Sequence, residues 1–197
     1  AVILATQGTT GHATLVNAAG LALQGTVSGN LSGTATTGDI SDSAALTVTG
    51  TSAFITGVTG SNIILDHASN AFTGAVSLIA DDGTENFGNI TFVDDSAVKL
   101  DANADAAGDL FIDTSGADGA VGGNLAVTAT TGNITQDGAL VLAVTGTSTL
   151  TTAATDATIT LGTATNALGG NVILTTAGTA GHVTIDNGTT ALGVEGT

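Results

Sequence analysis

The sequence has no Pro, Cys, Met, Trp or Tyr, and one Lys is its only basic residue apart from three His. Without Cys, no disulfide framework can form. The scarcity of Lys, Arg and Glu, together with abundant Thr, Val, Ile and Gly, disfavours helices and favours strands. Apolar runs are only a few residues long, so no membrane insertion is expected.

Charge excludes several classes of partner. The formal net charge is −16, from 17 Asp and Glu residues against the single cation Lys99. Nucleic acids and anionic membrane surfaces require a basic surface, so neither is expected as a partner. A polysaccharide lyase or hydrolase needs basic residues, or paired carboxylates among aromatic side chains. The sequence has five Phe and no Trp or Tyr, so no enzyme is expected.

What the sequence does contain is internal repetition. Residues 29–46 and 123–140 share 11 identities in 18 positions, and Val48–Ser52 returns unchanged as Val144–Ser148. The related blocks run over residues 29–78 and 123–174. Repetition of this kind predicts a repeat architecture.

The two ends of the sequence also resemble each other. Val2–Asn17 and Val172–Asn187 share 10 identities in 16 positions, at an offset of 172 − 2 = 170. Gly25-Thr26 returns as Gly196-Thr197, at an offset of 196 − 25 = 171. We therefore interpret residues 1–197 as a single segment of a longer repetitive protein, with a period of about 171 residues.

An insertion predicts the length of a coil. A Val-x-Leu block begins at Val2, Val76 and Val172, at intervals of 76 − 2 = 74 and 172 − 76 = 96. The second interval is longer by 96 − 74 = 22, and 20 of these additional positions lie before Gly123. A coiled β-structure absorbs an insertion most simply as a whole turn, because a partial turn moves later side chains to the wrong face. This predicts coils of about 20 residues and an extra coil within residues 81–122.

The fold that these patterns predict is all-β. Short apolar or alternating segments recur every seven to fourteen residues between Gly-, Asn- and Thr-rich turns. Two or three such strands fill one predicted coil, so the chain is expected to form a parallel β-helix (β-solenoid) of roughly 8–10 coils. Val, Ile, Leu and Ala would fill its narrow core.

The segments GNLAVTATTGNITQDGAL, VTGTSTL, ATDATITL and ATNALGGNVIL of the second block resemble the β-strand repeats of very large secreted bacterial proteins. These are the filamentous-haemagglutinin-like and autotransporter-like adhesins and related surface-fibre proteins. The resemblance covers nearly the whole chain and is weakest between Asp81 and Gly122. It implies a right-handed parallel β-helix, export to the cell surface, and a role in adhesion or fibre formation. It carries no catalytic motif.

Acidic residues gather in one part of the sequence. Ten of the 17 lie between Asp81 and Asp118. Carboxylate oxygens are the ligands that Ca²⁺ prefers, and stacked coils would otherwise bring like charges together. The candidate Ca²⁺ ligands are Asp81, Asp82, Asp94 and Asp95. The alternative is a solvated, turn-rich face on which Asp is simply a turn former. His12, His67 and His182 have no second ligand at metal-binding spacing and are expected in turns or at the surface.

Asn and Thr recur at equivalent positions of the repeats. The pairs Asn30/Asn124, Asn70/Asn166 and Asn17/Asn187 are expected to stack as internal amide ladders that satisfy the turns coil by coil. Thr-x-Thr pairs recur at irregular spacings of 13, 81, 21 and 9. An ice-binding face would need a regular ladder, so outward Thr is interpreted as a strand former.

These features together predict a structural repeat segment of an extracellular fibre or adhesin stalk. Its coils are expected to stack end to end, either with neighbouring repeats of the same chain or with other copies. The alternative is a carbohydrate- or surface-binding adhesin module, with glycans as partners, for which the sequence shows no specific patch. An ice-binding solenoid and a polysaccharide lyase fit less well, for the reasons given above.

Overall fold

The computed structural model describes residues 1–80, 88–113 and 120–196. All regular secondary structure in these ranges is β, and every strand pairing is parallel. The strands stack as a β-solenoid of about 8 turns with roughly 23 residues per turn. The predicted fold class is thereby confirmed, with a turn somewhat longer than the insertion in the sequence suggests.

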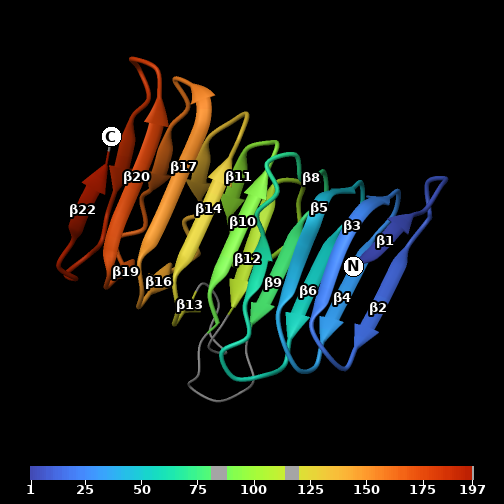
Figure 1. The fold of residues 1–197 in the computed structure, drawn as a ribbon. Coiled ribbons are helices and arrows are strands. Elements are labelled where there is room, and N and C mark those ends of the chain that lie inside the picture. The colour runs from blue at the N-terminus through green and yellow to red at the C-terminus, as the bar shows by residue number, and fades with distance from the viewer. Residues whose placement is uncertain (81–87, 114–119, 197) are drawn as a thin grey trace.

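Two long sheets form the main walls of the solenoid. Sheet A contains β1 (Val2–Ala5), β3 (Leu21–Val27), β5 (Ile40–Val48), β7 (Ile63–Leu65), β8 (Ala71–Phe72), β10 (Ile90–Asp94), β14 (Leu125–Ala129), β17 (Ser148–Thr155), β20 (Asn171–Ala177) and β22 (Gly193–Gly196). Sheet B contains β2 (Ala13–Asn17), β4 (Leu31–Ala35), β6 (Ser52–Thr56), β9 (Val76–Ala80), β12 (Asp109–Asp113), β11 (Val98–Leu100), β15 (Ile134–Gln136), β18 (Ile159–Leu161) and β21 (Val183–Ile185). A short sheet C contains β13 (Ala120–Val121), β16 (Ala143–Val144) and β19 (Ala167–Leu168). The N-terminal and C-terminal strands lie at opposite ends of the stack (Figure 1).

The core lies between the walls and is built by strict alternation. In β4, β6, β9, β10 and β14 every second residue is buried, as expected when one face of a strand packs inward. Leu, Ile and Val fill most of the interior. Near the middle, Phe72 packs edge-on against Phe54 with ring centroids 6.2 Å apart, and its ring lies 5.3 Å from that of Phe92.

Equivalent segments of the two related blocks lie on opposite sheets. In the first block, the Val-x-Leu segment at Val76 forms β9 on sheet B, whereas the segments at Val2 and Val172 form β1 and β20 on sheet A. The chain thus completes three and a half coils between Val2 and Val76. The longer offset, from Val2 to Val172, restores the original sheet, since β20 and β21 follow the sheets of β1 and β2.

Equivalent segments change sheets across a region where the order of the strands in sheet B differs from their order in the chain. Sheet B runs β9-β12-β11-β15, so β12 lies between β9 and the earlier strand β11. From β9 to β15, sheet B advances three rungs, whereas sheet A advances two from β7 to β14. We call this region, residues 88–113, the junction. The junction adds one rung to sheet B and none to sheet A. The predicted extra coil within residues 81–122 stays a prediction, because residues 81–87 and 114–119 lie outside the described ranges.

Stacked glycines form one corner of each block. In and before the first block the glycines precede strands of sheet B (Gly11, Gly29, Gly50, Gly74), and in and before the second block they precede strands of sheet A (Gly88, Gly123, Gly146, Gly170). A Cβ at Gly29 or Gly123 would lie 3.0 or 2.5 Å from the carbonyl oxygen of the glycine below. Any side chain at these positions would therefore push the coils apart.

Asparagines connect successive coils by capping backbone groups, and the predicted internal position holds for Asn70 and Asn166 but not for the exposed Asn30 and Asn124. Asn30 and Asn124 accept hydrogen bonds from the N–H groups of Thr51 at 3.1 Å and Thr147 at 2.8 Å, one coil further on. The buried Asn70 and Asn166 accept from Leu46 and Leu142 in the preceding coil. At the equivalent positions Asn17 and Asn187, the predicted internal amide is found only at Asn187. Asn17 is exposed and bonds within its own turn, whereas Asn187 is buried and bonds Leu168.

Candidate functional site

The only Lys of the chain lies in the junction, between two carboxylates. Lys99 on β11 is the direct register partner of Asp109 on β12. Its Nζ lies 3.0 Å from Asp109 Oδ1 and 2.7 Å from Asp101 Oδ2. The side chain of Asp109 is 1% exposed, and its Oδ2 accepts the Ala106 N–H at 2.8 Å. These three residues, the Lys99 cluster, tie the inserted strand β12 to β11.

The ion pairs shift the pKa values of Lys99 and Asp101. Hydrogen bonds to Asp101 and Asp109 raise the pKa of Lys99 above its ordinary value. Burial alone would raise the pKa of Asp101, but its hydrogen bonds with Lys99 and the Asn103 N–H outweigh burial and lower that pKa. The ammonium and the Asp101 carboxylate therefore stay charged at neutral pH.

Asp94, at the end of β10, occupies a buried position like those that Asn70 and Asn166 hold in other coils. It is 3% exposed, and its Oδ1 accepts the Phe72 N–H at 2.9 Å, as the two amides accept from the coil before. The Ser96 hydroxyl donates to Oδ2 at 2.7 Å. Burial raises the pKa of Asp94, and these hydrogen bonds oppose the rise only in part.

Asp94→Asn is expected to stabilise the protein at neutral pH. Because the folded-state pKa of Asp94 is raised, its carboxylate lowers stability at neutral pH, and the loss is relieved as pH falls through the raised pKa toward the ordinary 3.8. An amide keeps the acceptor for Phe72 and can donate to Ser96. Chemical denaturation of both proteins from pH 7 to pH 4 should show a stability gap that closes on acidification. A difference in stability that stays the same from pH 7 to pH 4 would contradict the prediction. Asp101, whose pKa is also shifted, is present in both proteins and therefore does not contribute to the difference.

The structure places the predicted Ca²⁺ ligands as follows. Asp81 and Asp82 lie outside the described residues. Asp94 is buried and bonded as above, whereas the adjacent Asp95 is exposed. Among the described residues, no three His, Asp or Glu side chains come together in a group that could hold a metal ion. The Ca²⁺ site therefore stays a prediction, to which the described part adds no coordinating group.

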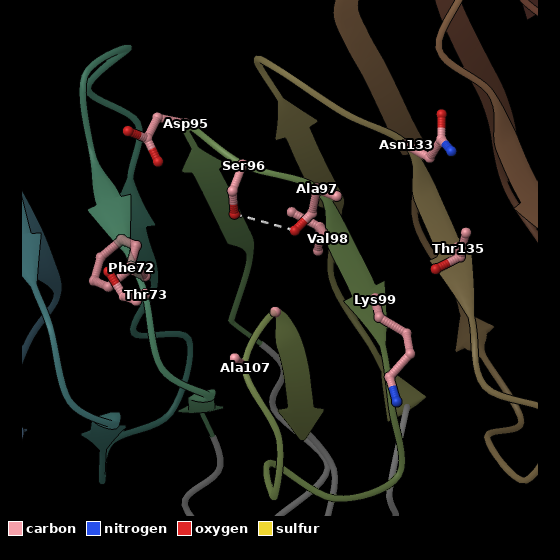
Figure 2. A pocket seen from close by; sticks show the side chains of 11 residues that line it. Phe72, Thr73, Asp95, Ser96, Ala97, Val98, Lys99, Ala107, Asn133 and Thr135 are labelled. Carbon is pink, nitrogen blue, oxygen red and sulfur yellow. Dashed lines mark hydrogen bonds between the residues drawn. The ribbon is translucent and has the colours of Figure 1, made fainter.

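An open groove lies beside the Lys99 cluster, where the chain turns from sheet A into sheet B (Figure 2). We call it the corner groove. It has a volume of about 490 Å³, and Thr73 and Lys99 line opposite sides of it. Asp95, Ser96, Asn133 and Thr135 add polar groups, and Phe72, Ala97, Val98, Ala107 and Gly108 complete its lining. Sequence reasoning missed this groove, because its walls come from four strands or turns that only the reversed order of β11 and β12 brings together.

His12 and His67 bond backbone groups between strands and His182 is exposed, in agreement with the predicted turn or surface positions. His12 Nδ1 accepts the Asn30 N–H at 2.8 Å, and thus fills a position that Asn30 fills one coil later. His67 Nδ1 accepts the Ser69 N–H at 3.1 Å. Across the described ranges, no helix has the length and apolar character needed to cross a membrane.

Comparison with known proteins identifies a family. A family model described as repeats of unknown function (DUF5649) covers residues 10–79 and 87–175. The first range contains the block at residues 29–78, and the second contains the block at residues 123–174. No curated protein and no solved structure is significantly similar to the chain.

Proposed function

The chain belongs to this family of repeats of unknown function, and we propose that it is a structural segment of an extracellular fibre or adhesin stalk at the cell surface. It has no enzymatic role in this proposal. Its coils continue by strand stacking into neighbouring repeats of the same polypeptide or into other copies of the chain. The resulting rod would be held by parallel strand ladders around a narrow apolar core.

The observation that carries the proposal is the return of each strand to its own sheet after one period. The segments that form β1, β2 and β3 recur one period later in β20, β21 and β22, on the same sheets. A second period can therefore follow the first in register, with sheet A continuing as sheet A. A single block would not suffice, because equivalent segments of successive blocks lie on opposite sheets.

The test is a chain in which Thr197 is followed directly by a second copy of residues 27–197. Electron cryo-microscopy should show one continuous rod, longer than the single chain by about 35 Å, the length of seven to eight rungs. Two separate particles joined by a flexible segment would contradict the proposal. Antibody labelling of intact, unpermeabilised cells that produce the protein tests the extracellular location, which internal labelling alone would contradict.

A further inference from the structure

The corner groove exists because one turn is missing from a regular column. In the first block, each turn from sheet A into sheet B carries a glycine that stacks on the turn below, up to Gly74. The next strand of sheet B is β12, and the chain enters it from β11 and not from sheet A. Gly108, which precedes β12, makes no such stack; the atom nearest to its Cβ position is the Ala97 carbonyl oxygen at 3.6 Å. The groove fills the space that the missing turn leaves.

The polar groups of the groove are held in place before any ligand arrives. The Ser96 hydroxyl is fixed by Asp94 at 2.7 Å, and Asn133 Oδ1 is fixed by the Thr158 N–H at 2.8 Å. Lys99 has three N–H donors, of which Asp101 and Asp109 engage two. Groups that are ordered in the free protein lose little entropy when a ligand binds.

The lining combines these groups with an apolar floor. Asp95 supplies an exposed carboxylate acceptor, and Thr73 and Thr135 supply hydroxyls that can donate or accept. Phe72 and Val98, each 2% exposed, form apolar lining. The volume falls within the range of about 300–1,000 Å³ that is usual for small-molecule sites.

Charge selects against ionic ligands. The lining of the groove contains one ammonium, that of Lys99, and one carboxylate, that of Asp95, so the charges of the lining balance. An anion would lie close to Asp95 and to the Asp101 and Asp109 carboxylates that Lys99 already engages, and a cation would lie close to the Lys99 ammonium. A neutral ligand with many hydroxyl groups can use the donors and acceptors together.

From these contacts we infer that the corner groove binds the end of a neutral oligosaccharide. The site goes beyond the structural role proposed above and does not depend on it. In a chain of many periods the groove would recur once per period along the rod. Weak single sites would then add up to firm attachment through avidity.

The experiment is an NMR titration of the ¹⁵N-labelled 197-residue chain. Maltotriose, cellotriose and mannotriose serve as neutral probes, 3′-sialyllactose as the anionic probe and spermidine as the cationic probe. At least one neutral probe should shift the amides of residues 73, 96–99 and 133–135, with a millimolar dissociation constant. No shift with any neutral probe, or preferred binding of an ionic probe, would overturn the inference.

Variants separate the groove from the general polar surface. Asp95→Ala and Thr135→Ala should each weaken binding about five- to tenfold, the effect of one lost hydrogen bond. The control is Thr160→Ala, because Thr160 pairs with Thr135 one rung further on and does not line the groove. It should leave binding unchanged, provided that all three variants retain the parent amide spectrum elsewhere. Equal weakening by Thr160→Ala would show non-specific contact with the threonine-rich wall and refute the site.

Discussion

Replacing Gly146 by Ala is expected to destabilise the solenoid by about 3 kcal/mol. The new Cβ would lie 2.5 Å from the Gly123 carbonyl oxygen and 2.8 Å from its carbon, atoms of the backbone one coil below. Neither can move without shifting β14 against β17, which pair over five residues. The same methyl group would collide with Asn124 Oδ1, which caps the Thr147 N–H. Thermal and denaturant unfolding would measure the loss.

Gly138→Ala is the matched control for Gly146→Ala. No atom lies within 4 Å of the Cβ position at Gly138, and its φ is not in the left-handed region. The substitution should therefore change stability by no more than about 0.5 kcal/mol, and restriction of the unfolded chain favours a small gain. Similar effects of the two substitutions would mean that the stacked corner contributes little.

Replacing the buried Asn166 by Ala is expected to cost about 3 kcal/mol or more. Its Oδ1 accepts the Leu142 N–H at 3.0 Å, and its Nδ2 donates to the Asp186 carbonyl oxygen at 3.1 Å. It also forms a reciprocal amide pair with Gln136, at 2.6 and 2.9 Å. Alanine would leave the buried Leu142 N–H without a partner, which costs about 1–3 kcal/mol. It would also remove the bonds to the Gln136 amide and the Asp186 carbonyl oxygen, each worth about 0.5–1.5 kcal/mol.

Hydrogen exchange would localise the effect of Asn166→Ala. The amide of Leu142 should lose protection, together with its neighbours in β16 and β19, while β4 and β6 in the first block keep theirs. Repeat proteins couple mainly to nearest neighbours, so a local loss is the expected pattern. Asn171→Ala is the control, since Asn171 is exposed and its side chain bonds Glu195 at 3.1 Å. A change of similar size in this control would contradict the role assigned to the buried amide.

The acidic segment shows which features of the site residue composition predicts and which it does not. The sequence identifies the concentration of Asp around Lys99 and makes a cation site a reasonable hypothesis. It does not indicate that Lys99 pairs with Asp109, ten residues later, because that contact requires β12 to fold back beneath β11. Nor does it indicate that Asp94 is buried like Asn70, since both residues are ordinary at a strand end or in a turn.

The sequence by itself determined the parallel coil, the inward alternation of Val, Ile and Leu, and the corner residues Gly and Asn. These features are local, and each copy of the repeat contains the residues that specify them. Only the tertiary structure decided which sheet each copy joins and where the corner groove opens. A strand's partner depends on the number of coils completed before it, and a half coil or one inserted rung changes that partner without altering any local pattern.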